Sequence, residues 1–271
     1  MHKLVIDADK KQALLNFREL FNFRDLFITL TYRDIKVRYA QTFLGIIWAL
    51  VQPVITLLIF ILIFNKAINV NTGDIPYPVF ALCGMSAWAY FSFVMAQSGN
   101  SIIAEQAMIK KIYFPRLIIP LSKGVTGLVD FFIALLLVFI VIAFYGLPLT
   151  LNLLYLPFFI LLNIITALGA GIWISALSIR FRDFQHIVPF VIQLGLYASP
   201  IAYPASIIPE KYVGLYYLNP MAFVVEGFRW SLAGGVSPHP YGVFSVLIVL
   251  SVFVSGLIYF NKTEQTMADI V

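Results

Sequence analysis

The sequence predicts an all-α integral membrane protein with six transmembrane helices, an N-terminal amphipathic interface helix, and short re-entrant helices between the fifth and sixth spans. Of its 271 residues, 61% are hydrophobic and only 11% are charged, whereas an ordinary soluble domain is about 25% charged. The mean hydropathy is +0.92, and apolar runs of bilayer-spanning length recur along the chain. A soluble fold of this size would leave too much apolar surface in water. The composition therefore argues against a soluble enzyme or a nucleic-acid-binding protein.

The first element is expected to be a helix over residues 17–39 that lies at the membrane surface. Its polar residues follow one another at intervals of three or four and therefore form one stripe: Arg18, Asn22, Asp25, Thr29, Arg33 and Lys36. Most of the apolar residues lie opposite, which is the pattern of a helix in the headgroup region. A cytoplasmic helix packed on a partner protein is the alternative. With the preceding tail, this helix forms an N-terminal unit of residues 1–42, followed by a membrane domain of residues 43–271.

Six apolar segments are expected to cross the bilayer, because a spanning helix needs about 20 mostly apolar residues. They are residues 43–64, 79–99, 117–145, 153–178, 187–203 and 241–260. In the fourth segment, Ala167, Gly171 and Ser175 recur every four residues, and small residues at that spacing let two helix backbones approach closely. The partner of this face is either another helix of the same chain or a second copy.

Residues 204–240 are apolar only in patches, and neither patch is long enough to span. Glu226 and Arg229 interrupt the second patch, and Pro209, Pro220 and Pro238 break helices. We expect one or two short helices that dip into the outer leaflet, which requires that protein or a cavity covers their backbone. An ordinary extracellular loop with a surface helix is the alternative.

The basic residues predict the orientation, since lysine and arginine collect in cytoplasmic loops. Of the 18 lysines and arginines, 15 lie on the side of the N-terminal segment, and only Lys66, Lys211 and Arg229 lie on the other. This distribution fits an even number of spans with both termini in the cytoplasm.

Several kinds of chemistry are missing from the sequence. No glycine is followed by lysine, so the phosphate-binding loop Gly-x-x-x-x-Gly-Lys-Ser/Thr does not occur. The histidines His2, His186 and His239 form no pair with metal-ligand spacing. Asp130 is the one carboxylate inside a clear span. We expect it toward the cytoplasmic end, paired with a base such as Lys123 rather than used in ion coupling.

Three stretches of sequence occur in a distinctive order and spacing. They are RYAQTFLGIIW (38–48) with Pro53 soon after, RDF (182–184) with Pro189, Gln193 and SPIAYP (199–204), and LNPM (218–221) with Phe228 and Arg229. Together they resemble the membrane subunit of the bacterial ABC-type polysaccharide exporters, a type-2 ABC permease family that serves O-antigen, capsule and teichoic-acid export. The resemblance covers nearly the whole chain.

The resemblance implies a fold and a set of partners. The family has six spans, an N-terminal interface helix and short outer gate helices. Two copies form a homodimeric channel for a lipid-linked polysaccharide, and each copy docks one separate ABC ATPase subunit. ATP and Mg²⁺ then belong to that partner, so the chain itself holds no cofactor or metal and is not an enzyme. The expected location is the bacterial cytoplasmic (inner) membrane, among membrane lipids and without nucleic acid.

The resemblance also assigns residues on the cytoplasmic side. Residues 102–115 and 179–185 match the coupling segments, whose candidate ATPase contacts are Glu105, Lys110, Lys111, Arg180, Arg182 and Asp183. Topological anchoring by positive charge is the alternative for the last three. Arg38 and Tyr39 are candidates for contact with the lipid-linked pyrophosphate at the entrance, because arginine suits phosphate recognition. Snorkelling to headgroups is their alternative.

Channel-lining aromatics are expected from the first and fifth spans, with Trp48 and Tyr197 as candidates, because flat apolar faces hold sugar rings loosely and a moving polymer needs weak contacts. The outer-gate candidates are Tyr203, Pro204, Asn219, Pro220, Glu226 and Arg229. The prolines fix the backbone where helices stop. Glu226 and Arg229 lie three residues apart and are expected to pair on one helix face, either within a gate or as the staple of a rigid loop.

The leading hypothesis is the transmembrane subunit of an ATP-driven exporter of a lipid-linked glycan. A type-2 ABC permease for a small molecule or drug has the same fold and stays open as an alternative. An ion-coupled secondary carrier is an alternative from another class and would depend on Asp130. An integral-membrane glycan enzyme would need clustered acids or a metal site, and the sequence offers neither.

Overall fold

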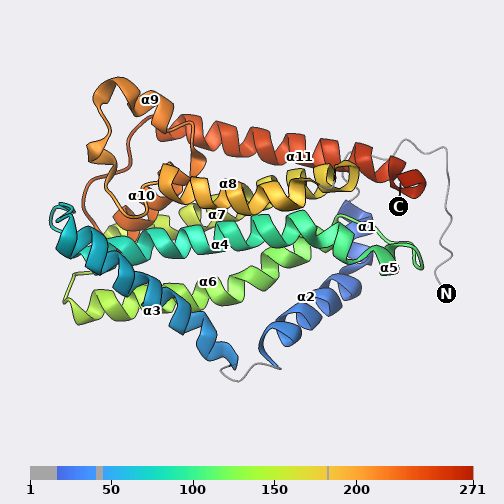
Figure 1. Cartoon of the computed structure of the whole chain (residues 1–271), viewed down its shortest axis with the longest axis horizontal. Coiled ribbons are helices and arrows are strands. Elements are labelled where there is room, and N and C mark those ends of the chain that lie inside the picture. Colours follow the sequence, from blue (N-terminus) through green and yellow to red (C-terminus); the bar gives the residue numbers. More distant parts are fainter. Residues whose placement is uncertain (1–16, 41–44, 182, 271) are drawn as a thin grey trace.

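The computed structural model describes residues 17–40, 45–181 and 183–270, and every regular element in these ranges is helical. In chain order the elements are α1 (Phe17–Asn22), α2 (Arg24–Tyr39), η1 (Gly45–Ile47), α3 (Trp48–Phe60), η2 (Ile61–Ala67), α4 (Tyr77–Ala104), α5 (Gln106–Ile109), α6 (Ile118–Phe144), η3 (Leu151–Tyr155), α7 (Leu156–Arg180), α8 (Phe184–Ala198), η4 (Ala205–Ile207), η5 (Glu210–Tyr212), α9 (Val213–Tyr216), α10 (Pro220–Ala233) and α11 (Gly242–Ile270). The long helices run side by side along the longest axis (Figure 1). α1 and the last turn of α11 lie at one end of this bundle, and α9 lies at the other.

Five helical stretches in the described part of the chain are long and apolar enough to cross a membrane. They are Gly45–Ala67, Tyr77–Ala104, Ile118–Phe144, Leu151–Arg180 and Gly242–Glu264. They correspond to the first four predicted spans and to the last one. The chain is therefore a multi-pass membrane protein, as its composition predicts.

The predicted fifth span is shorter than expected, so the count of six is not confirmed. Its helix, α8, has 15 residues and a length of about 22 Å. It ends at Ala198 because Ser199 precedes a proline and takes up extended backbone, with φ −102° and ψ 148°.

α4 and α7 form the centre of the bundle. α4 packs against α6, α7 and α10, while α7 packs against α4 on one side and α11 on the other. The small-residue face of α7 meets α4, since a Cβ atom on Gly171 would lie 2.7 Å from the Cβ atom of Ser98. Ala167 and Ser175 on the same face are fully buried. The predicted close approach is confirmed, and its partner is a helix of the same chain.

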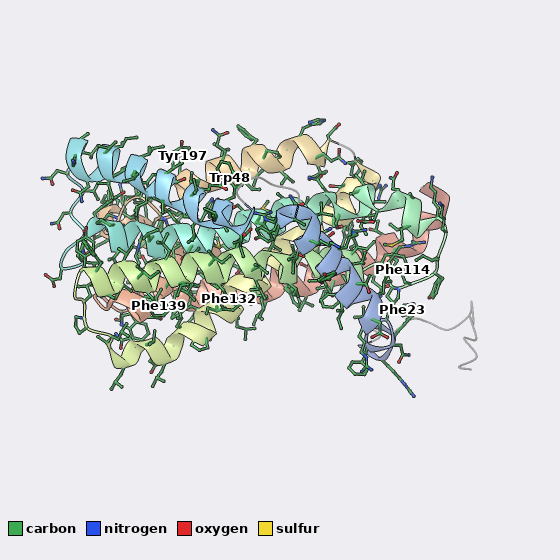
Figure 2. The ribbon with its side chains drawn as sticks, turned by 90° about the horizontal axis from the view of Figure 1, so that it is seen from below. Phe23, Trp48, Phe114, Phe132, Phe139 and Tyr197 are labelled. Atoms are coloured by element: carbon green, nitrogen blue, oxygen red, sulfur yellow. The ribbon has the colours of Figure 1, made fainter. Side chains whose placement is uncertain are left out.

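A second cluster of buried apolar residues closes the end of the bundle at which α2 lies. Leu30 of α2 joins Ile102, Ile118, Ile172 and Phe260 from four other helices there. Figure 2 shows Phe23 and Phe114 at this same end; Phe114 belongs to the cluster, and Phe23 packs against it. This packing holds the N-terminal helices on the bundle.

The predicted helix over residues 17–39 is present, but it is divided into α1 and α2 at Phe23. Its polar stripe is exposed except at Arg33, which is half-buried. The buried face carries Leu30 and Thr31, and Phe21 and Tyr32 remain exposed. The helix itself is confirmed, and its place at the membrane surface stays a prediction.

α3 and α8 are attached to the bundle less extensively than the other long helices. In the most apolar window of Gly45–Ala67 only 6% of residues are buried, against 72% for Tyr77–Ala104. α8 has one buried residue, Val188. Figure 2 places Trp48 of α3 and Tyr197 of α8 along the same edge of the bundle. This edge therefore presents two apolar helices that their own chain does not cover.

The region of residues 204–240 contains the expected short helices, namely η4, η5, α9 and α10. α10 packs against α4, α7 and α11. It begins at Pro220, a favoured first helical residue, and Asn219 caps it by accepting a hydrogen bond from the backbone N–H of Met221 at 3.1 Å. The depth of these helices in a membrane and their use as a gate stay predictions.

Candidate functional site

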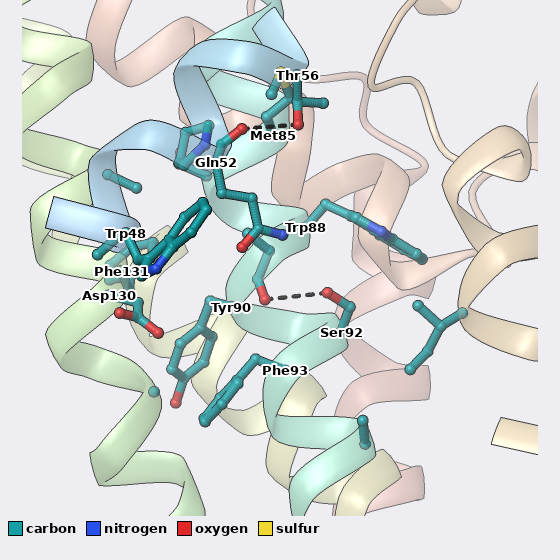
Figure 3. A pocket seen from close by; sticks show the side chains of 18 of the residues that line it. Trp48, Gln52, Thr56, Met85, Trp88, Tyr90, Ser92, Phe93, Asp130 and Phe131 are labelled. Atoms are coloured by element: carbon teal, nitrogen blue, oxygen red, sulfur yellow. Dashed lines mark hydrogen bonds between the residues drawn. The ribbon is translucent and has the colours of Figure 1, made fainter. Parts of the chain in front are cut away.

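A cavity of about 760 Å³ lies between α3, α4, α6 and α8, next to the exposed edge formed by α3 and α8. Its described lining includes five aromatic rings on three helices, Trp48, Trp88, Tyr90, Phe93 and Phe131, and Figure 3 shows them around the same space. Gln52 and Gln97 add amide groups to the lining. Aromatic faces with a few polar groups suit a ligand that presents both C–H faces and hydroxyls.

α3 lines the cavity because its polar and aromatic residues recur every four positions. Trp48, Gln52 and Thr56 occupy one face of this otherwise apolar helix. The Thr56 hydroxyl donates to the Gln52 carbonyl at 2.9 Å, a contact drawn in Figure 3. Its donor is thereby satisfied within the helix, and its oxygen can still accept a hydrogen bond from a ligand.

One end of the cavity carries a cluster of charged and polar side chains. Arg38 forms an ion pair with Asp130 at 2.5 Å, and the Tyr39 hydroxyl donates to the other carboxylate oxygen. The Arg38 guanidinium also lies 4.4 Å from the ring centroid of Phe93. Burial and the neighbouring carboxylate raise the pKa of Tyr39 to about 12, so this phenol stays a donor at neutral pH. All three residues of the cluster line the cavity.

Asp130 pairs with a base, as predicted, but the base is Arg38 and not Lys123. Asp130 and Lys123 lie seven positions apart on α6, which separates them by about 10 Å along the axis. Residues of α2 reach both of them instead, because α2 packs across α6. Asp34 forms an ion pair with Lys123, and Arg38 forms one with Asp130.

The predicted ATPase contacts fall into two groups. Glu105 follows the last residue of α4 and forms an ion pair with Arg33 of α2, with a second contact from Arg33 Nη1 to Glu105 Oε2 at 3.1 Å. Its carboxylate is thus used within the chain. The other described candidates, Lys110, Lys111, Arg180 and Asp183, are exposed. Arg182 lies outside the described residues.

The segment that follows α5 is hydrogen-bonded to the first described helix, α1, and to the last one, α11. The Tyr113 hydroxyl donates to the Glu19 carboxylate of α1 at 3.2 Å. Arg116 donates from its backbone N–H to the Glu264 carboxylate of α11 at 2.9 Å, and from Nη1 to the Glu264 carbonyl at 2.7 Å. Directly before the first of these anchors, Ile112 presents an exposed apolar side chain.

The predicted ion pair between Glu226 and Arg229 is wrong. Arg229 is 5% exposed and donates to two backbone carbonyls, from Nε to Phe80 at 3.1 Å and from Nη2 to Ile201 at 2.9 Å. Its guanidinium lies 3.4 Å from the Phe80 ring centroid. Burial lowers the pKa of Arg229 to about 10, which leaves it charged at neutral pH. Glu226 instead accepts a hydrogen bond from the Tyr217 hydroxyl.

The remaining outer-gate candidates hold the segment between α8 and α10. The Asn219 amide donates to the Ser199 hydroxyl at 2.9 Å, and the Tyr203 hydroxyl donates to the Tyr197 carbonyl at 3.0 Å. Pro204 has extended backbone directly before η4. Tyr197 is 66% exposed and does not belong to the described lining of the cavity, whereas Trp48 does.

Sequence reasoning missed Trp88, Phe93 and Gln52 as cavity residues, and it missed Arg33 and Asp34 as ion-pair partners. The repeat of Trp48, Gln52 and Thr56 at four-residue intervals in an apolar span is a signal that identifies the α3 face. No comparable signal marks α4, where the rings lie among many other apolar residues.

The comparison with known proteins adds to this geometry. The sequence profile of the ABC-2 type transporter family matches residues 25–233. The chain belongs to this family. It is 30% identical to the O-antigen export system permease protein RfbA of Klebsiella pneumoniae over 248 residues, which cover 91% of this chain and 95% of that protein.

Two further relatives carry related names. The RfbA protein of Myxococcus xanthus, also an O-antigen export system permease protein, is 29% identical over 78% of this chain and 82% of its own length. The polysialic acid transport protein KpsM of Escherichia coli is 25% identical over 87% of this chain and 92% of its own length. Membership of the ABC-2 type transporter family argues against an ion-coupled secondary carrier and against a glycan enzyme.

Proposed function

We propose that this chain is the transmembrane subunit of an ATP-driven ABC exporter that moves a lipid-linked polysaccharide, O-antigen-like or related, across the bacterial cytoplasmic membrane. The observation that carries the proposal is the 30% identity to an O-antigen export permease over 91% of this chain and 95% of that protein. The relatives with polysaccharide names align over most of their own lengths, so the comparison extends beyond a shared segment.

The cavity supports a glycan as cargo. Trp48, Trp88 and Phe93 offer flat apolar faces, and Gln52 and Gln97 offer groups that exchange hydrogen bonds with hydroxyls. Contacts of this kind are individually weak and are repeated along the wall, which is what passage of a polymer requires.

Two copies of the chain form the channel in this proposal. α3 and α8 expose large apolar side chains along the edge beside the cavity, among them Ile55, Leu58, Phe190 and Leu194. A second copy placed against this edge would bury these side chains and enclose the cavity between the protomers. The outer-gate residues around Asn219 and Arg229 would then lie at the outer end of that channel.

Six crossings with both termini in the cytoplasm fit the rest of the proposal. α8 is about 22 Å long, and residues 199–202 behind it are buried, so we take α8 with this extension as the fifth crossing. α1 and the last turn of α11 lie at the same end of the bundle (Figure 1), as an even number of crossings requires.

ATP and Mg²⁺ would bind to a separate ATPase subunit, two copies of which would serve the homodimer. The exposed residues Lys110, Lys111, Arg180 and Asp183, with the exposed Ile112 directly before the anchored Tyr113, would provide the docking surface. Arg182 stays a candidate for the same ATPase contact.

Deletion of the gene in its native host tests the proposed cargo. We expect loss of the surface polysaccharide, restoration by the full-length chain, and co-purification of that chain with an ATPase subunit. ATP hydrolysis by the isolated chain would contradict the proposal that a separate subunit carries the ATPase activity. An unchanged surface polysaccharide combined with loss of export of a small molecule or drug would assign the alternative cargo.

A further inference from the structure

The charged cluster at the end of the cavity is electrically balanced within the chain. Among the described residues that line the cavity, Arg38 is the one cation and Asp130 the one carboxylate. They form an ion pair at 2.5 Å, with side chains that remain 39% and 24% exposed. Neither charge is sealed in the protein, so a ligand in the cavity can reach both of them.

Attachment of α2 to the bundle does not require this pair. Asp34 already binds Lys123 on α6, and both of those side chains are more deeply buried, at 14% and 12% exposure. Arg33 binds Glu105 beyond the end of α4. Asp130 nevertheless places a carboxylate inside a membrane span, which is costly, so we look for a use other than attachment.

Arg38 keeps a second contact that does not depend on Asp130. Its guanidinium lies 4.4 Å from the centroid of the Phe93 ring, and a ring face holds a cation by its quadrupole. If the carboxylate withdraws, the guanidinium stays in the cavity with its donors free. The Tyr39 hydroxyl, which donates to the same carboxylate, can then donate to a ligand oxygen in its place.

We propose that Asp130 is a displaceable internal counter-ion, which occupies Arg38 and Tyr39 until the phosphate of an anionic lipid headgroup replaces it. A carboxylate and a phosphate present similar oxygens to arginine, so Arg38 and Tyr39 keep the hydrogen bonds that they donate, while Asp130 gives up both of its partners. Competition from Asp130 would then weaken the binding of anionic phospholipids from the surrounding membrane. When the headgroup moves on, Asp130 would reclaim Arg38 and favour release. The inference rests on the proposed function of the chain as the membrane subunit of a lipid-linked glycan exporter.

Binding of defined ligands to the purified full-length chain tests the exchange. The probes are geranylgeranyl diphosphate, dioctanoyl phosphatidylglycerol, inorganic pyrophosphate and the uncharged geranylgeraniol. The readout is quenching of tryptophan fluorescence, because two of the four tryptophans, Trp48 and Trp88, line the cavity. Binding of the diphosphate lipid but not of pyrophosphate would identify a lipid headgroup as the ligand.

Asp130→Asn removes the competing charge, so we expect both anionic lipids to bind about tenfold more tightly, by similar factors. Binding of geranylgeraniol should not change. Asp130→Glu keeps the charge and should bind like the wild type. Asp34→Asn is the matched control, because Asp34 pairs with a lysine outside the cavity lining; it should leave all four affinities unchanged. Asp130→Ser makes the same charge change if Asp130→Asn does not fold.

Two results would overturn the inference. Weaker binding of the anionic lipids to Asp130→Asn would mean that Asp130 only positions Arg38, and unchanged binding would mean that it does not compete. Failure of the proposed function appears elsewhere, as an unchanged surface polysaccharide in the deletion strain. A strain that loses its polysaccharide while Asp130→Asn fails to tighten anion binding would refute the counter-ion alone.

Discussion

Replacing Arg229 by methionine should destabilise the protein by about 3 kcal/mol. The substitution removes two hydrogen bonds from a charged donor to the buried carbonyls of Phe80 and Ile201, at 3.1 and 2.9 Å. Each such bond contributes about 1.5–3 kcal/mol, and the guanidinium contact with the Phe80 ring adds about 1 kcal/mol. Relief of the buried charge offsets part of this loss, which gives the net figure.

Thermal unfolding of the purified chain in detergent measures this effect. By the scale for larger domains, a loss of about 3 kcal/mol lowers Tm by about 6–12 °C. Arg24→Met removes an arginine that is 61% exposed and should leave Tm unchanged. An Arg229→Met protein as stable as the wild type would refute the reasoning.

Glu226→Gln separates this account from the expected ion pair. An amide carbonyl still accepts the hydrogen bond that Tyr217 donates to Glu226, so we expect a loss of less than about 1 kcal/mol. A loss as large as that of Arg229→Met would mean that an ion pair between Glu226 and Arg229 stabilises the fold after all.

The other predictions concern packing, docking and the channel. Gly171→Ala places a Cβ atom 2.7 Å from the Cβ atom of Ser98 and should destabilise the chain by about 1–3 kcal/mol, whereas Gly214→Ala meets nothing within 4 Å and should be neutral; equal Tm values for the two variants would contradict this packing. Lys110→Glu should reduce co-purification of the ATPase subunit at least severalfold, while Lys211→Glu, in the expected outer region, should not. Trp48→Ala should lower the amount of surface polysaccharide at equal protein level, and Trp48→Phe should retain most of it because the aromatic face is kept; equal loss in both variants would argue against stacking.

The features of the fold that depend on residues close together in the sequence could be predicted from it. Runs of apolar residues mark five of the six expected spans, and the spacing of Ala167, Gly171 and Ser175 predicts a close helix contact that forms. The length of α8 was misjudged, because residues 199–203 continue the apolar pattern although Pro200 prevents the helix from continuing with them.

The pairing of charges could not be predicted in the same way. Both expected pairs, Asp130 with Lys123 and Glu226 with Arg229, join residues close together on one helix. The partners that form instead come from elements remote in sequence, since Arg38 reaches Asp130 from α2 and Arg229 reaches the carbonyl of Phe80 on α4. The order of residues carries no direct signal of such contacts. The cavity could not be predicted for the same reason, because its walls come from four helices that are separate in the sequence.

The anchoring of residues 113–116 has a mechanical consequence. Tyr113 is bonded to the start of the described chain at Glu19, Arg116 to its far end at Glu264, and Glu105 just before them to Arg33 of α2. A displacement of this segment would therefore be passed through these contacts to α1, α2 and the C-terminal part of α11. It would couple two regions that are separated by almost the entire polypeptide.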